Sequence, residues 1–256
     1  MGYFERIGTA EFRATEHVGG AWQISEQHIA PSLGLLCHLV EADRDQRRGD
    51  GLQIARLSYD IYGTVPVAEV ATAIEVIRPG RTIELVEASM SHAGRTIVRM
   101  RAWLMSGVDT IALAATPLSP MPGPDRLEPW VPADVWPGGF ISSVEVRRAQ
   151  AEPGRAQFWV RTDHPLIEGE PSSPLARAVG LFDIANGMTV RADPREVAFP
   201  NLDLTAHLFR SPEPGWIGFD TSVSFGPTGL GLTSSVLHDE RGPIGTLAQS
   251  LTVRPL

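Results

Sequence analysis

The residues best suited to chemistry are an acid and an amide on two expected strands in the last quarter of the sequence. Apolar and polar residues alternate from Asn201 to Phe209, which puts Asp203 on the polar face together with His207. Gln249 shares its row with Leu247 and Leu251, so its amide should be at least partly buried and needs a partner. A carboxylate from a neighbouring strand is one candidate partner, and a backbone carbonyl is the other.

These residues belong to a segment whose outline occurs twice in the chain. The stretch from Ala55 to Tyr62 resembles the stretch from Pro200 to His207 in its apolar positions, and the stretch 94–101 resembles 242–249 in the same way. The polar positions differ between the copies, so a duplicated domain with its chemistry in one half is expected.

The order of the expected elements supports such a duplication. Each half should contain one apolar helix, buried on all sides, followed by a four-stranded antiparallel meander. We predict an α+β fold, a double hotdog in which two curled antiparallel sheets each wrap round one buried helix. The expected helices cover Ser25 to Asp43, with Ser25 as N-cap, and Ser173 to Asn186; the expected strands cover 53–62, 67–78, 81–91, 95–106, 140–148, 155–162, 200–210, 215–225, 229–238 and 243–253.

A proline-rich stretch separates the two halves. Repeated prolines from Pro117 onward remove backbone donors and disfavour a helix or a central strand. The sequence therefore predicts an N-terminal domain over residues 1–116, a linker over 117–139 and a C-terminal domain over 140–256.

Composition limits the classes of function. The chain has 256 residues, a formal net charge of -8 and one cysteine, Cys37. The negative charge argues against binding to nucleic acid or to an anionic membrane surface. The single cysteine excludes an intramolecular disulfide, and the N-terminal residues lack the apolar run of a signal peptide. These features favour a cytoplasmic protein.

Several segments resemble the acyl-CoA thioesterase II family and the thioesterase-like proteins common in actinobacteria. The segments are Asn201 to Arg210 (NLDLTAHLFR), Phe225 to Leu232 (FGPTGLGL), Val236 to Gly242 (VLHDERG), Ala248 to Pro255 (AQSLTVRP), Trp22 to His28 (WQISEQH) and Arg78 to Arg81 (RPGR). Members often have two glycines after the first-half His, whereas here Ile29 and Ala30 follow His28, which leaves a narrower pocket or no ligand contact at that helix start.

The resemblance implies hydrolysis of an acyl thioester without a metal or other cofactor, CoA being part of the substrate. Carried over by position, Asp203 is the catalytic general base, Gln249 the amide and Ser224 the hydroxyl that hold the attacking water. Thr221 and Ser222 are the alternative hydroxyls, and His28 and Thr221 are the substrate-binding candidates. Backbone N–H groups at a helix start would bind the oxyanion. The expected partners are an acyl-CoA substrate and further copies of the chain, as a homodimer or higher homo-oligomer. Hotdog sheets commonly pair edge to edge, and one such pairing is expected inside the chain, between its two halves.

Two other functions remain open from the sequence. A hotdog hydratase or dehydratase shares the fold and would need an Asp–His pair at one site, for which His207 and Asp203 share a strand face. A non-catalytic acyl-thioester binding protein is the third possibility. Serine hydrolase and zinc hydrolase chemistry are disfavoured, since the sequence contains neither a GxSxG elbow nor an HExxH pattern.

Overall fold

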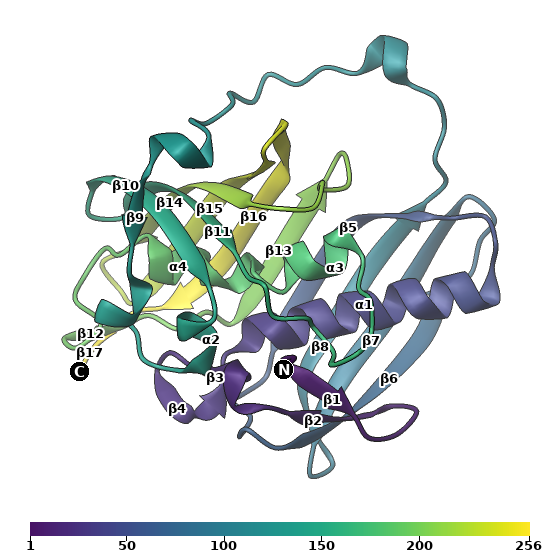
Figure 1. Ribbon diagram of the computed structural model, residues 1–256, viewed down its shortest axis with the longest axis horizontal. Coiled ribbons are helices and arrows are strands. Elements are labelled where there is room, and N and C mark those ends of the chain that lie inside the picture. Colours follow the sequence, from purple (N-terminus) through teal and green to yellow (C-terminus); the bar gives the residue numbers. More distant parts are fainter.

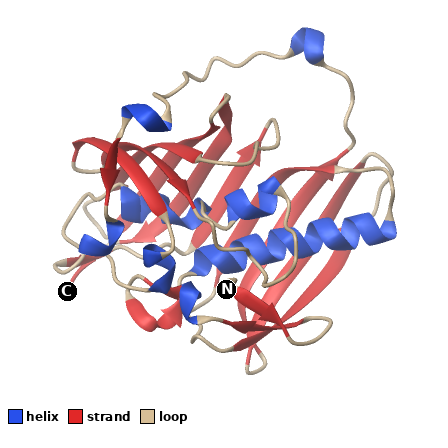
Figure 2. Cartoon of the chain, viewed as in Figure 1, coloured by secondary structure: helices blue, strands red, loops and turns tan.

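The strands of both halves join in one large antiparallel sheet in the computed structural model, which describes residues 1–256 (Figures 1 and 2). Its order is β1-β2-β6-β7-β8-β5-β13-β16-β15-β14-β11-β10-β9. We call residues 1–116 the N-terminal half and residues 117–256 the C-terminal half. The strands of this sheet are β1 (Phe4–Arg6), β2 (Glu11–Ala14), β5 (Gln53–Ile61), β6 (Glu69–Arg78), β7 (Ile83–His92), β8 (Arg95–Met105), β9 (Glu128–Trp130), β10 (Glu145–Glu152), β11 (Arg155–Arg161), β13 (Asp203–Leu208), β14 (Ile217–Phe225), β15 (Leu230–Asp239) and β16 (Gly242–Thr252).

The halves meet where β5 pairs antiparallel with β13, in a register that sets Leu204 opposite Tyr59 and Ala206 opposite Leu57. The two predicted curled sheets are thus joined edge to edge into one continuous sheet. The meanders β5 to β8 and β13 to β16 lie close to the predicted strand ranges, because alternating burial is the strongest local strand signal.

The long helix α1 (Ile29–Arg47) lies across the concave face of the N-terminal part of the sheet (Figure 1). Its residues from Ala30 to Cys37 are buried, whereas its last turns are polar. The helix is capped by His28 and not by Ser25, which lies in strand β4 (Gln23–Gln27). Strand β4 pairs with β3 (Gly19–Gly20) in a small separate hairpin beside the helix start. The 3₁₀ turn η1 (Glu16–Val18) precedes this hairpin.

The second expected helix is broken into three short pieces. It begins as predicted after the N-cap Ser173, as α3 (Pro174–Val179), and continues through the 3₁₀ turn η5 (Phe182–Ile184) into α4 (Ala185–Met188). Gly34 permits a close approach of α1 to the end of α3, because a Cβ on Gly34 would stand 2.7 Å from the Gly180 Cα. The break turns Asp183 into the interior of the molecule.

An exposed arch precedes the proline-rich stretch. Residues 107–115 are exposed and form an arch away from the body that carries η2 (Ile111–Leu113), visible at the top of Figure 1. Met121 and Leu127 pack on Trp159 of the C-terminal half. Pro129 lies within β9, where a proline is tolerated because β9 is an edge strand of the sheet.

The remaining short elements are η3 (Pro124–Arg126), η4 (Pro132–Asp134), α2 (Gly139–Ser142, where a strand was expected) and the pair β12 (Val197–Ala198) with β17 (Arg254–Pro255).

One hydrophobic core of 54 buried residues extends through both halves. No helix in the structure has the length and apolarity that spanning a membrane requires. The shared core and the continuous sheet place the start of α1, from the N-terminal half, against η5, from the C-terminal half.

Candidate active site

A cavity of about 620 Å³ lies between the start of α1 and the broken helix of the C-terminal half. Its walls are largely apolar, with Trp22 and Trp136 in an edge-to-face arrangement at a centroid distance of 4.9 Å. Trp136 is fixed by its indole N–H, which donates to the Gly187 carbonyl at 2.9 Å. Three polar side chains reach the cavity from different elements and lie close together: His28, Asp183 and Asn201.

Asp183 is the centre of this group. It lies on η5 and its residue is only 5 % exposed. Its Oδ1 accepts two hydrogen bonds, from Asn201 Nδ2 at 2.6 Å and from Gln249 Nε2 at 2.9 Å. Its Oδ2 accepts none, so one carboxylate oxygen is held by amides and the other stays open toward the cavity.

The environment of Asp183 makes it a base near neutral pH. Burial raises the pKa of its carboxyl from 3.8 to about 7, while the hydrogen bonds from Asn201 and Gln249 act in the opposite direction. A carboxyl that titrates close to the working pH is well matched to general acid–base catalysis, because the basic form is present and still strong enough to accept a proton.

His28 faces Asp183 across the cavity. The His28 Nδ1 lies 3.9 Å from Asp183 Oδ2, too far for a hydrogen bond, and accepts one from the Ala30 N–H at 3.2 Å. Burial lowers the pKa of the imidazole from 6.5 to about 3, so the ring is neutral. Because Nδ1 is an acceptor, the single proton of this neutral ring is on Nε2.

The first turn of α1 offers a backbone donor beside these side chains. The Ala30 N–H is taken by His28, and Pro31 has no N–H. The Ile29 N–H has no acceptor in the protein, and Ile29 lines the cavity. The start of a 19-residue helix favours negative charge, so this end of the cavity suits an oxyanion.

Gln249, expected to be a buried amide with a carboxylate partner, is 1 % exposed and bonded to Asp183. The expected partner, Asp203, makes no hydrogen bond to it. Asp203 follows the opposite face of the sheet, where its Oδ1 accepts from the Ser250 N–H at 2.6 Å. Side chains alternate between the two faces along β13, and Leu204 is an inward residue, so Asp203 lies on the outer face. Gln249 is buried on the inner face.

The hydroxyl candidates Ser224, Thr221 and Ser222 also lie outside the cavity. Ser224 is exposed on the outer face of β14. Thr221 points inward and is fully buried, but its hydroxyl bonds to Ser235 at 2.7 Å. His207, the possible partner of Asp203, is exposed on the outer face of β13. Of the five candidate site residues, the structure therefore brings Gln249 and His28 together and leaves Asp203, Ser224 and Thr221 elsewhere.

Asp183 and Asn201 are the site residues that the sequence reasoning missed. Asp183 stands alone among apolar residues between Leu181 and Ala185, and a lone acid inside an apolar helix is itself a signal, since ionisable groups are seldom fully buried without a role. Asn201 stands two residues before Asp203, and its position in the sequence carries no separate signal. The structure contains no cluster of three His, Cys, Asp or Glu side chains arranged to hold a metal ion.

Comparison with known proteins places the chain in a family. Residues 18–105 match the acyl-CoA thioesterase N-terminal domain, and residues 119–253 match the acyl-CoA thioesterase C-terminal domain. No curated protein sequence matches the chain.

Solved structures with the same fold cover nearly the whole chain at low identity. A protein from Novosphingobium aromaticivorans assigned as a thioesterase has a TM-score of 0.74 at 20 % identity, covering 99 % of both chains. A hot dog fold protein of unknown function from Alicyclobacillus acidocaldarius has a TM-score of 0.74 at 14 % identity, covering 98 % of this chain and 95 % of its own.

An acyl-CoA thioesterase II from Mycobacterium marinum has a TM-score of 0.69 at 15 % identity, covering 99 % of this chain and 96 % of its own. These likenesses establish an α+β fold of the hotdog type. The two family matches together span most of the sequence, and the chain belongs to the acyl-CoA thioesterase family of thioester hydrolases.

Proposed function

We propose that Asp183 is the general base of this thioesterase and that the substrate is an acyl-CoA. The observation that carries the proposal is the one-sided bonding of the carboxylate: Oδ1 is fixed by the amides of Asn201 and Gln249, and Oδ2 is open toward the cavity. In this proposal the sheet is a duplicated hotdog, with the predicted domain bounds of 1–116 and 140–256, and the site lies where the two units meet.

The reaction begins with a water held at Asp183 Oδ2. The carboxylate takes a proton from this water as its oxygen attacks the thioester carbonyl carbon, and the carbonyl oxygen gains negative charge. The Ile29 N–H and the Nε2–H of neutral His28 are the donors that stabilise this oxyanion. Collapse of the intermediate breaks the C–S bond, and the proton on Asp183 passes to the departing thiolate.

The roles of the amides differ from those that the sequence suggested. Gln249 and Asn201 act through Asp183, because both donate to its Oδ1 and so direct its other oxygen toward the cavity. They also moderate the effect of burial on the Asp183 pKa, which keeps the basic form accessible near neutral pH. The apolar cavity walls suit an acyl chain or the pantetheine arm.

The test is release of free thiol from a series of acyl-CoAs of increasing chain length. Asp183→Asn should lower kcat by about 10²- to 10⁴-fold, the usual contribution of a general base. The matched controls are Asp203→Asn and Ser224→Ala, which change residues on the outer face of the sheet and should keep turnover near that of the wild type. Loss of turnover in Asp203→Asn and its retention in Asp183→Asn would overturn the proposal.

A second candidate function is supported by one observation. His28 and Asp183 come from different halves and face each other across one cavity, with 3.9 Å between Nδ1 and Oδ2. An acid and an imidazole in this arrangement could also add or remove water at the α,β-carbons of an acyl thioester. Loss of enoyl absorbance from an enoyl-CoA without thiol release would indicate this dehydratase chemistry.

A further inference from the structure

A single cationic side chain lines the active-site cavity, and it has no partner. Of the residues that line the cavity, Arg254 is the only lysine or arginine. It lies on β17, it is exposed, and its guanidinium makes no salt bridge or hydrogen bond within the protein. In a chain of net charge -8, a free arginine on the wall of a substrate cavity is an available anion-binding group.

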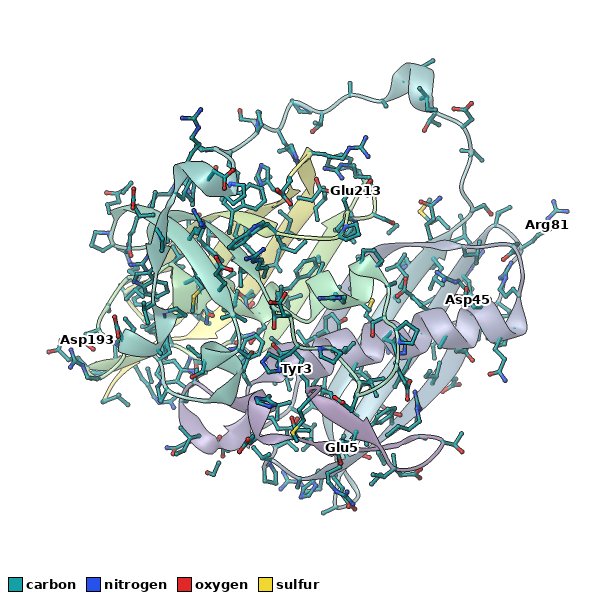
Figure 3. The ribbon with its side chains drawn as sticks, in the orientation of Figure 1. Tyr3, Glu5, Asp45, Arg81, Asp193 and Glu213 are labelled. Carbon is teal, nitrogen blue, oxygen red and sulfur yellow. The ribbon has the colours of Figure 1, made fainter.

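The neighbouring arginines are occupied. Arg195 forms an ion pair with Asp193, which Figure 3 labels at the edge of the molecule, and is bound by both carboxylate oxygens. The Nη1 of Arg191 donates to the Pro153 and Val223 carbonyls, and its guanidinium lies 5.7 Å from the Phe225 ring. At this end of the cavity only Arg254 therefore has a positive charge without a partner in the protein.

The backbone connects Arg254 to the reacting centre over a short distance. Arg254 pairs with Ala198 in the β12–β17 pair, and Asn201, three residues further along the chain, donates to Asp183. Three residues of extended backbone span about 10 Å. Ala198 and Pro200 line the cavity between them, so the wall is continuous from Asp183 to Arg254.

We infer that Arg254 binds a phosphate group of the thioester's carrier arm. The inference depends on the proposed function, because it places the thioester at Asp183 and the anionic end of the same substrate at Arg254. A flexible pantetheine arm would follow the apolar wall between the two. The phosphate has two sources, the phosphopantetheine phosphate that CoA and carrier proteins share, or the nucleotide phosphates that only CoA contains.

The test compares substrates that differ in their phosphates. kcat/KM is measured for one acyl group on CoA, on phosphopantetheine and on pantetheine, with the wild type, Arg254→Gln and Arg195→Gln. Removal of Arg254 should lower the preference for acyl-CoA over acyl-pantetheine about fivefold, the upper range for an exposed ion pair, through KM. The control Arg195→Gln removes an equally peripheral cation that is outside the cavity, and should keep the wild-type preference.

The three substrates separate the outcomes. A loss of preference for both phosphorylated substrates assigns the phosphopantetheine phosphate, and a loss for acyl-CoA alone assigns the nucleotide; either supports the inference. An unchanged preference in Arg254→Gln, or an equal change in Arg195→Gln, overturns it. Failure of the proposed function is a different result, since all three substrates would then be hydrolysed normally by Asp183→Asn or not hydrolysed by the wild type.

Discussion

Replacement of Asp183 by asparagine should stabilise the protein at neutral and alkaline pH, although it lowers kcat. The raised pKa means that the folded protein resists ionisation of this carboxyl until about pH 7, whereas the unfolded chain ionises near pH 3.8. The unfolded state therefore loses its proton first, and the free energy of unfolding falls as the pH rises between these values. At pH 8 this pKa difference lowers the free energy of unfolding by about 4 kcal/mol relative to a carboxyl with the same pKa in both states.

An asparagine at position 183 removes this penalty without a change of shape. Its Oδ1 can still accept from Asn201 and Gln249, and its Nδ2 takes the place of the open Oδ2. Denaturant unfolding of both proteins from pH 4 to pH 8 measures the effect. Near pH 4 the two should be about equally stable, and the variant should gain up to about 4 kcal/mol over the wild type as the pH rises past 7. Parallel curves across this range would refute the reasoning, because they would mean that Asp183 ionises as easily in the folded protein as in the unfolded chain.

Two further predictions concern the groups that hold and face Asp183. Gln249→Leu removes one hydrogen-bond donor to the Asp183 carboxylate, a bond worth about 1.5–3 kcal/mol. The pKa of Asp183 should therefore rise, and the acidic limb of the kcat–pH profile should move up by about one to two pH units. An unmoved limb in a folded variant would show that Gln249 does not affect the pKa of Asp183. His28→Ala removes the cap of α1, which should cost about 1 kcal/mol of stability, and removes the Nε2–H donor, which should lower kcat about 10²-fold. His28→Asn should restore the stability, since asparagine caps helices well, but not the turnover; recovery of both would assign His28 a purely structural role.

The meanders, the first buried helix and an edge-to-edge pairing of the two halves were predictable from the sequence, but the particular strands that pair were not. Burial alternates along β7 and β16 as the residue types require, so both strands were found within a few residues. The pairing of β5 with β13 depends on free strand edges meeting across more than 140 residues, which local patterns do not encode.

The amide of the site was predictable, and its acid was not. Gln249 is a polar residue in an apolar row, and that alone indicated a buried partner. Asp203 is the acid that the resemblance implies, because it lies in the family-like segment from Asn201 to Arg210. The alternation of β13 places its side chain on the face of the sheet opposite to Gln249. Asp183 reaches Gln249 only because the second helix breaks at Gly180 and η5 turns inward, a tertiary feature without a periodic signal.

The union of β5 with β13 has a consequence for how the chain could be divided. The exposed arch over residues 107–115 contributes no strand to the sheet, whereas the halves it joins share backbone hydrogen bonds and one core. Its contribution is thus to raise the effective concentration of one half near the other. A chain cut in this arch would be a two-fragment protein whose pieces find each other by strand complementation. Its catalytic activity would report their reassembly, because His28 comes from one fragment and Asp183 from the other.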